Sequence, residues 1–295
     1  MTERPVLAGA LGAFVIAFSG IFVRLADVSP STAALFRCAY ALPALGLLAW
    51  IENRRFGARP RRERVLAFAA GFWFAADLTF WHHSIDAVGA GLATVIANVQ
   101  VVLVALIAWA VLSERPDSRV LGSIPLLFFG VVLISGVIGA GAYGDDPVLG
   151  VAFGVATALA YALFLLILRQ ANVDDRRPAG PLFDATLSGA AFSALGGLVV
   201  GDLDWVPNLE AQAWLVALAL TSQVLGWLLI SVSLPRLPAV ITSIVLMLQP
   251  VAAVIFAALL LSEAPSVVQL AGVAIVLAGV VFATSKPRTP AATAS

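Results

Sequence analysis

The sequence predicts an all-α membrane protein with ten transmembrane helices, built as two five-helix repeats of inverted topology. Three observations predict it: an apolar composition, a series of helix-length apolar runs, and a match between the two halves of the chain. Of the 295 residues, 61% are hydrophobic and 12% are charged, and the mean hydropathy is +1.01. Soluble domains are typically about 45–50% apolar and about 25% charged. The chain is therefore expected to bury its apolar surface in lipid.

The individual helices follow from the apolar runs, because a helix needs about 20 apolar residues to cross the bilayer core. Runs without any charged residue occupy 5–23, 88–112, 120–144, 147–168, 211–235, 239–262 and 264–285. Three further spans contain one charged residue each: 28–51 with Arg37, 65–84 with Asp77, and 181–201 with Asp184. The connections are short, so no soluble domain is expected. The first run is too long for a typical signal-peptide core, so we expect no cleavage there.

Basic residues mark one side of the predicted bundle. Fifteen of the 17 basic residues fall before the first helix, in every second connection, or after the last helix. They are Arg4, Arg54, Arg55, Arg59, Arg61, Arg62, Arg64, Arg115, Arg119, Arg169, Arg176, Arg177, Arg236, Lys286 and Arg288. The opposite connections hold one basic residue, Arg24, and a set of acidic ones: Asp27, Asp86, Asp145, Asp146, Asp202, Asp204, Glu210 and Glu263. Because basic loops stay in the cytoplasm, both termini are predicted to be cytoplasmic.

An internal repeat relates the two halves. The segment VVLVALIAWAVLSERP at 101–116 matches PVAAVIFAALLLSEAP at 250–265, an offset of 149, and a Gly-Val-Val triplet follows both at the same distance. Near the start of each half, an offset of 145 pairs Gly9 with Gly154 and Arg24 with Arg169. Five helices per half is an odd number, so the second copy must enter the membrane from the opposite side. Such inverted repeats are typical of secondary transporters, which bind substrate near the midplane between the halves.

These boundaries give a first repeat at 1–140, a second repeat at 147–286, and a disordered cytoplasmic tail at 287–295. Two five-helix halves, Arg37 in the second helix, and an S-E-x-P turn before a helix with Gly-Val-Val resemble the EamA family of the drug/metabolite transporter superfamily. Within that family the chain is most similar to the bacterial amino-acid and metabolite exporters, the YddG-like group included. The resemblance implies a multi-pass exporter of the bacterial inner membrane that hydrolyses no ATP.

Other function classes find little support in the sequence. The net charge is 0 and basic residues are confined to short loops, which argues against nucleic-acid binding. Cys38 is the only cysteine and there are two histidines, so we expect neither a metal site nor a cofactor. An intramembrane enzyme lacks its signatures, because no H-E-x-x-H, G-x-S-x-G or P-loop motif is present. A channel would need a continuous polar path, and a receptor or scaffold would not explain the repeat.

Polar residues at membrane depth are costly unless they are paired or face water, so each is a candidate for function. In the third helix, Trp73, Asp77 and Trp81 recur at helical spacing, and His82 lies near the extracytoplasmic end. This stripe predicts a cavity wall that offers stacking and attraction for cations. An alternative is a structural ion pair between Asp77 and Arg37 of the neighbouring helix. His82 is expected to line the outer mouth rather than to bind a metal.

Two glutamines occupy equivalent positions near the centres of the fourth and ninth helices. Gln100 and Gln249 are predicted to bind substrate from opposite halves, and Asn98 to contribute from the same helix as Gln100. An equally weighted alternative is hydrogen bonding between helices. Members of the family often have Pro in both helices, whereas here Pro250 follows Gln249 but Val101 follows Gln100.

The remaining predicted contacts are Tyr161 in the sixth helix and Gln223 with Trp227 in the eighth. A cavity of amides, hydroxyls and indoles with at most one carboxylate suits a neutral or zwitterionic solute with an apolar part. Amino acids fit this description, aromatic ones especially, and the alternative is a lipophilic cation held by Asp77. The expected partners are this small solute and membrane lipids, and the expected state is a monomer.

Overall fold

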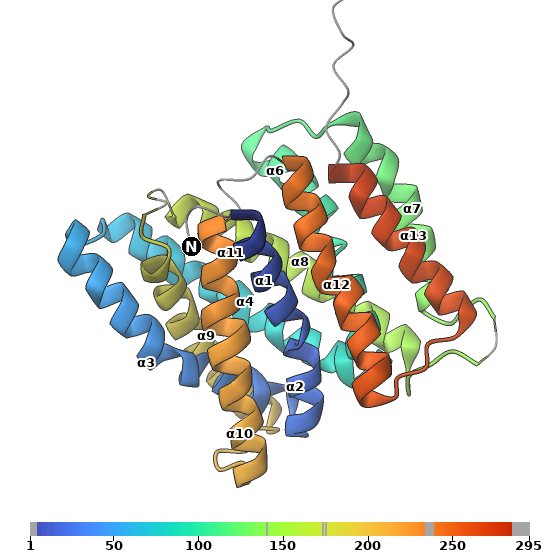
Figure 1. Ribbon diagram of the computed structural model, residues 1–295, viewed down its shortest axis with the longest axis horizontal. Helices are drawn as coiled ribbons and strands as arrows, with labels where there is room; N and C mark the ends of the chain where they lie inside the picture. Colours follow the sequence, from blue (N-terminus) through green and yellow to red (C-terminus); the bar gives the residue numbers. More distant parts are fainter. Residues whose placement is uncertain (1–4, 140, 173, 175, 234–238, 285–295) are drawn as a thin grey trace, which may run out of the picture.

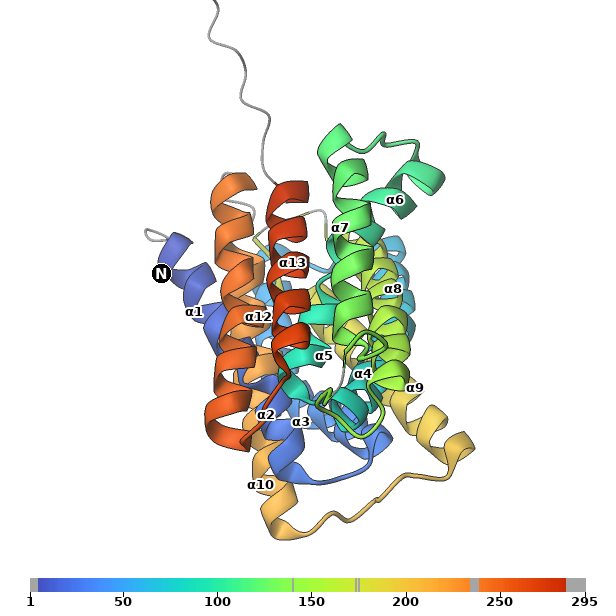
Figure 2. The ribbon, with the colours of Figure 1, turned by 90° about the vertical axis from the view of Figure 1, so that its right-hand side faces the viewer.

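The computed structural model describes residues 5–139, 141–172, 174, 176–233 and 239–284. Within them the chain is helical and contains no strand, and Figures 1 and 2 show the helices side by side in one bundle. In chain order they are α1 (Pro5–Ala17), α2 (Ser19–Ala26), α3 (Pro30–Phe56), α4 (Arg61–Val88), α5 (Ala90–Ala97), α6 (Gln100–Leu112), α7 (Ser118–Ile134), α8 (Pro147–Ala171), α9 (Ala179–Val200), α10 (Leu209–Leu218), the π-helix η1 (Ala219–Gly226), α11 (Trp227–Ser233), α12 (Ala239–Leu261) and α13 (Val267–Thr284).

Each predicted apolar run contains a helical segment. Eight stretches among the described residues are long and apolar enough to span a membrane: Pro5–Ala26, Pro30–Phe56, Arg61–Val88, Ala90–Val111, Pro147–Ala171, Ala179–Val200, Leu209–Ser233 and Val267–Thr284. Two shorter apolar helices accompany them, at Ser118–Ile134 and Leu248–Leu261. The prediction of an all-helical, multi-pass membrane protein is confirmed at this level.

Polar side chains mark where helices begin. Asp146 precedes α8, and its Oδ1 accepts a hydrogen bond of 3.0 Å from the backbone N–H of Leu149. Asn208 precedes α10 in the same way and accepts a bond of 2.8 Å from the N–H of Ala211. The first N–H groups of a helix have no partner within the helix, so these caps define its start. Pro147 at the first position of α8 needs no such partner.

The predicted helix at 120–144 is too long, because α7 ends at Ile134. The residues that follow are rich in glycine, and Gly136 and Gly139 have φ angles of +72° and +98°. Only glycine adopts these angles without strain, so the chain leaves the helix there despite its apolar character. The segment instead forms a connection that leads to α8.

The predicted helix at 88–112 is interrupted. α5 ends with Asn98 as its C-cap, and α6 begins at Gln100 after Val99. The interruption lies in the half that lacks proline, next to Val101, whereas α12 continues through Pro250. Proline therefore does not determine which of the two equivalent helices is broken. Backbone bonds between residues three apart bridge the break, from the N–H of Asn98 to the carbonyl of Val95 at 3.1 Å and from the N–H of Val99 to that of Ile96 at 3.0 Å.

Equivalent residues of the two halves make equivalent contacts. Gly154 on α8 lies against Ser84 on α4, such that a Cβ at this glycine would come within 3.2 Å of the serine Oγ. Gly9 on α1 lies against Ser233 on α11, with a corresponding distance of 3.0 Å. The glycines differ by 145 and the serines by 149, the offsets of the sequence repeat. The first helix of each half therefore packs against the other half.

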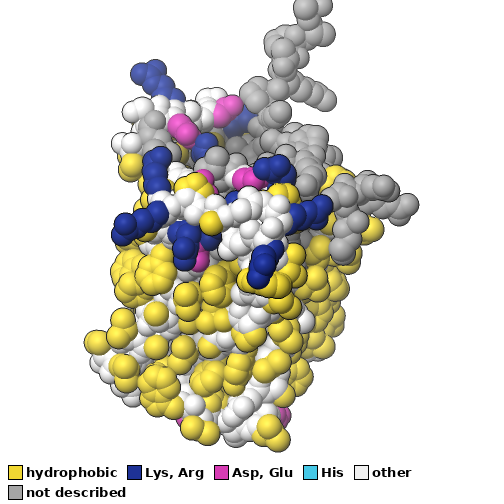
Figure 3. Space-filling view, turned by 90° about the vertical axis from the view of Figure 1, so that its left-hand side faces the viewer, with side chains coloured by type: hydrophobic (Ala, Val, Ile, Leu, Met, Phe, Trp, Pro, Cys, Tyr) yellow, Lys and Arg dark blue, Asp and Glu magenta, His cyan; other side chains and the backbone are white. Residues whose placement is uncertain are grey.

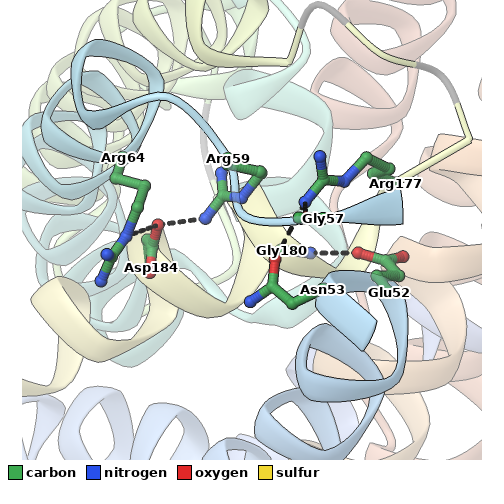
Figure 4. Close-up of polar contacts among 8 residues, drawn as sticks. All are labelled: Glu52, Asn53, Gly57, Arg59, Arg64, Arg177, Gly180 and Asp184. Carbon is green, nitrogen blue, oxygen red and sulfur yellow. Dashed lines mark hydrogen bonds and ion pairs between the residues drawn. The ribbon is translucent and has the colours of Figure 1, made fainter. Parts of the chain in front are cut away.

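α3 and α9 are joined at both of their ends. At one end, the Glu52 carboxylate accepts hydrogen bonds of 2.9 and 2.8 Å from the N–H groups of Ala179 and Gly180, which begin α9. Figure 4 shows the bond from Gly180. At the other end, a carboxylate oxygen of Asp202, just after α9, accepts a bond of 3.4 Å from the N–H of Ser31 near the start of α3. The two helices therefore run antiparallel, and each helix begins where the other ends.

Around the Glu52 contact, arginines tie the α3–α4 connection to α9 and to the segment before it. Arg177 donates hydrogen bonds of 2.9 Å to Oδ1 of Asn53 and 2.6 Å to the carbonyl of Gly57 (Figure 4). Asp184 in α9 forms an ion pair with Arg59, which accounts for its position in an apolar span. Figure 3 shows arginine side chains gathered at this end of the molecule, above a belt of apolar side chains.

The ends of the bundle differ in the connections they carry. Figure 2 shows the α6–α7 connection at one end and the α12–α13 connection at the opposite end. These two connections contain the matching S-E-x-P turns of the repeat, at 113–116 and 262–265. The same motif therefore lies at opposite ends of the bundle in the two halves.

Candidate substrate-binding site

A buried arginine lies where helices of both halves meet. Arg37 on α3 is only 4% exposed, and its Nε donates a hydrogen bond of 2.9 Å to Oε1 of Gln223 on η1. Its Nη1 donates to Oγ of Ser19 at 3.1 Å, and the amide of Gln223 donates to Oγ1 of Thr186 on α9 at 3.2 Å. Each of these partners is neutral, so the contacts orient the guanidinium without cancelling its charge.

The π-helix positions Gln223 for this role. η1 spans Ala219–Gly226, and Gln223 lies within it and is fully buried. A π-helical turn is wider than an α-helical one and occurs mostly at functional sites. Gly226, the last residue of η1, allows η1 to approach α1 closely, since a Cβ at this glycine would come within 2.4 Å of the Ile16 side chain.

Asp77 on α4 is an acidic residue that interacts electrostatically with the arginine. It is 7% exposed and interacts in the same way with Tyr161 on α8. The ion pair that the sequence offered as an alternative is not among those between the described residues, since no oxygen of Asp77 lies within 4.0 Å of a nitrogen of Arg37. The guanidinium instead lies over the ring of Trp81, 5.9 Å from its centroid. The two charges are therefore close but separate.

An aromatic wall borders these charges. Trp227 on α11 lies 6.1 Å from Tyr161, 5.7 Å from Phe164 and 6.4 Å from Phe74, as measured between ring centroids. The rings meet edge-on, an arrangement that aromatic pairs favour. We call the polar and aromatic residues together the Arg37 cluster. It comprises Ser19, Arg37, Phe74, Asp77, Trp81, Tyr161, Phe164, Thr186, Gln223 and Trp227.

Two other predicted residues of α4, Trp73 and His82, are not part of the Arg37 cluster. Trp73 is partly buried and packs against the same apolar cluster as Trp227 and Phe74. His82 is 1% exposed, and its Nδ1 lies 3.1 Å from the carbonyl oxygen of Pro30 at the start of α3. The imidazole thus holds α4 against α3, and this contact fixes its position.

The predicted polar residues of the fourth and ninth helices lie elsewhere in the bundle. Asn98 donates a hydrogen bond of 2.8 Å to the carbonyl of Thr94, within its own helix. Gln100 begins α6 directly after the break, and Gln249 lies in the middle of α12. Both glutamines are partly exposed.

Sequence reasoning missed several residues of the cluster. Ser19, Phe74, Phe164 and Thr186 were not predicted, and Arg37 was predicted only as a possible partner of Asp77. A serine, a threonine or a phenylalanine in an apolar run is too common to mark a site. The charge of Arg37 was the feature that could have indicated these partners, because a cation at membrane depth must have polar partners.

The cluster combines three binding features within one buried region. The guanidinium of Arg37 can bind a carboxylate, and the carboxylate of Asp77 can bind an ammonium group. The aromatic wall can accept an apolar or aromatic side chain. These features come from helices of both halves, so relative movement of the halves would change the site.

Comparisons with known proteins agree with this architecture. The sequence profile of the EamA-like transporter family matches residues 4–136 and 148–285. One solved crystal structure superimposes over 96% of both chains, with a TM-score of 0.62 and 17% sequence identity, and shows a shared fold. No curated protein matches the chain. Because the profile covers most of its length in two copies, the chain belongs to the EamA-like transporter family of the drug/metabolite transporter superfamily and is a membrane transporter.

Proposed function

We propose that the protein exports amino acids, with a preference for neutral and aromatic ones, by alternating access through a cavity between its two halves. The observation that carries this proposal is the buried guanidinium of Arg37, which is oriented by neutral partners from both halves and lies near Asp77. An uncompensated charge is costly in an apolar interior. A ligand with both charges would offset that cost.

Each part of an aromatic amino acid has a counterpart in the cluster. Arg37 receives the carboxylate and Asp77 the ammonium group, since the two side chains supply opposite charges that interact electrostatically. The side chain then lies against Trp227 and Tyr161, whose ring centroids are 6.1 Å apart. The direction of transport is outward, in keeping with the exporters that the sequence resembles.

The proposed topology has ten spans in two inverted repeats, with both termini in the cytoplasm of a bacterial inner membrane. Three observations support it: equivalent glycine contacts at offsets of 145 and 149, antiparallel packing of α3 and α9, and basic residues gathered at one end. α7 is short for a span at 17 residues. Such a length is at the lower limit of what crosses a bilayer.

A second candidate function is export of lipophilic cations. Asp77 and the indole of Trp81 favour it, since a carboxylate and an aromatic face both attract cations. Arg37 disfavours it, because its guanidinium would repel a ligand that carries only positive charge. The two candidates therefore differ in their need for a substrate carboxylate.

The decisive experiment is transport of a labelled panel in proteoliposomes, with and without a pH gradient. The panel pairs phenylalanine with phenethylamine, which lacks the carboxylate, and includes a lipophilic quaternary ammonium ion. Transport of phenylalanine in clear preference to phenethylamine supports amino-acid export. Transport of the two cations without phenylalanine would overturn the proposal in favour of the second candidate.

A further inference from the structure

Two glutamates occupy equivalent turns at opposite ends of the bundle. Ser113 and Ser262 follow the apolar helices of the repeat and have φ angles of +58° and +57°. Directly after them, the N–H groups of Glu114 and Glu263 each bond to the carbonyl six residues earlier, at 3.3 and 3.2 Å. The local backbone is therefore the same in both halves, and any difference between the glutamates arises from their surroundings.

Glu263 is buried against the start of a helix from the first half. It is 4% exposed, and its two carboxylate oxygens accept hydrogen bonds from the N–H groups of Ala90 (2.6 Å) and Gly91 (3.1 Å). Those groups begin α5 and have no side-chain cap of their own. Gly89 before them has a φ of +88°, and a Cβ there would lie 2.8 Å from the carboxylate. The fit is close enough to seal α12 against α5 at this end.

Glu114 has a different environment. Its side chain is 50% exposed, and the carboxylate forms an ion pair of 3.3 Å with Arg169 at the end of α8. By the offset of 149, the groups equivalent to Ala90 and Gly91 are the backbone N–H groups at 239 and 240, which begin α12. By the offset of 145, the residue equivalent to Arg169 is Arg24, at the end of α2.

Arg24 is placed to receive Glu263. It is half exposed, pairs with Asp86 at a distance of 3.8 Å, and interacts electrostatically with Glu263. The repeat thus gives each glutamate two candidate partners in the opposite half. One is the start of a helix, and the other is an arginine, Arg169 for Glu114 and Arg24 for Glu263. In this structure Glu263 has the first kind of partner and Glu114 has the second.

We propose that Glu114 and Glu263 are paired gate residues that exchange these two kinds of partner during the transport cycle. This proposal rests on the alternating access proposed above. In the present conformation Glu263 closes its end by capping α5. In the opposite conformation Glu114 caps α12 and Glu263 pairs with Arg24. The present structure therefore contains both arrangements: the capping arrangement at Glu263 and the ion-paired arrangement at Glu114.

The two partners differ in how strongly they bind the carboxylate. A buried carboxylate with two backbone donors loses both bonds when it is truncated, and leaves two buried N–H groups unpaired. A half-exposed ion pair contributes little, since water and salt screen it. Removal of either glutamate should therefore destabilise mainly the state in which that residue caps a helix. The two truncations should shift the conformational equilibrium in opposite directions.

The test measures accessibility of a cysteine at the Glu263 end in the full-length protein. Ala257 on α12 is 1% exposed and would lie 3.3 Å from a Cβ on Gly91. Ala257→Cys in a Cys38→Ala background is labelled with a water-soluble maleimide in nanodiscs. Glu263→Ala should raise the labelling rate by about tenfold, which corresponds to about 1.4 kcal/mol. Glu114→Ala should lower the rate below that of the parent. The control Glu210→Ala removes an exposed carboxylate from the first turn of α10 and should leave the rate unchanged.

The proposal is overturned if folded Glu263→Ala protein keeps the parental rate, or if Glu114→Ala raises the rate or leaves it unchanged. If Glu263→Ala does not fold, the exposed Glu114→Ala variant decides alone. Labelling requires no substrate, so a failure to transport amino acids would affect the proposed function without affecting this result. If the protein transports amino acids but the two glutamate variants do not shift the labelling rate in opposite directions, the gate proposal is rejected and the proposed function stands.

Discussion

The Nε atom of Arg37 donates a hydrogen bond of 2.9 Å to Oε1 of Gln223, and the two side chains are 4% and 0% exposed. This bond joins α3 of the first half to the π-helix of the second half. The two residues are 186 positions apart in the sequence, and no local sequence pattern predicts their contact. The bond fixes the orientation of the charge on which the proposed site depends.

Replacement of Gln223 by leucine should destabilise the protein. It leaves a buried guanidinium N–H without an acceptor, and hydrogen bonds to charged groups contribute roughly 1.5–3 kcal/mol. We expect a loss of that order in the free energy of unfolding, measured by thermal or denaturant unfolding in detergent. Ser222→Ala is the matched control, because Ser222 lies next in η1 and makes only a bond of 3.5 Å. Equal stability of the two variants would contradict the assigned role of Gln223.

Asp77→Asn should weaken the binding of amino acids through their ammonium group. We expect phenylalanine to lose affinity by about tenfold or more, since a charge-assisted bond becomes a neutral one. Phenylpropionate, which lacks the amine, should bind the variant and the parent equally well. Binding to the purified protein is measured by calorimetry for both ligands. A similar loss for both would place Asp77 in a structural role.

Gln100→Leu and Gln249→Leu test whether the substrate path reaches both glutamines. Each variant should keep its fold, because leucine is well tolerated among apolar helices. Each should weaken substrate binding by roughly 1–3 kcal/mol if one buried hydrogen bond to the ligand is lost. Transport kinetics in proteoliposomes and direct binding provide the measurement. Normal affinity and rate in both folded variants would identify the glutamines as contacts between helices.

The proposed topology predicts the accessibility of the connection between α7 and α8. A cysteine in place of Asp145, in a Cys38→Ala background, should react with an impermeant maleimide added outside intact cells. A cysteine in place of Arg62, at the basic end, should react only after the cells are opened. Labelling of residue 145 from the cytoplasmic side alone would reverse the orientation.

Opening at the Glu263 end should depend on pH. Burial raises the pKa of Glu263 above the usual glutamate value of 4.5, against the opposing effects of the N–H groups of Ala90 and Gly91 and the charge of Arg24. The closed state therefore binds the proton more tightly than an open state in which the carboxylate meets water. Acidification should favour closure, and raising the pH from 4.5 through the raised pKa should favour opening.

The measurement is labelling of the cysteine at position 257 across this pH range, normalised to a cysteine in place of the exposed Glu210. Among the described residues, the ionisable groups that interact with Glu263 are Arg24 on α2 and Tyr143 in the α7–α8 connection. Glu263→Ala should abolish the normalised pH dependence. An unchanged dependence in that variant would assign the effect to another group.

The sequence predicted the helical segments well, because an apolar run of helix length has few alternatives in a membrane protein. It failed where the backbone follows rules other than hydropathy. The glycines at 136 and 139 end α7 early, and the chain breaks at Asn98–Val99 rather than at Pro250. Mean hydropathy over a helix-length segment predicts neither the early end of α7 nor the break between α5 and α6, because both lie within apolar sequence.

The candidate site was predictable only in part. Asp77, Trp81, Gln223 and Trp227 stood out because they are polar or bulky in otherwise apolar helices, and the structure brings them together around Arg37. Which charges pair could not be predicted, since it depends on contacts between residues far apart in the chain. Adjacent helices suggested an ion pair between Arg37 and Asp77, whereas the bonds of Arg37 go to residues on two other helices.

The reciprocal attachment of α3 and α9 has a consequence for how the molecule moves. Glu52 holds the start of α9 and Asp202 holds the start of α3, so neither helix can slide or tilt without breaking contacts at both ends. We therefore expect α3 and α9 to move as one unit in any change of conformation. Backbone amides at Ser31 and Gly180, although each lies in the first turn of a helix, should then exchange with deuterium as slowly as amides in the middle of the bundle.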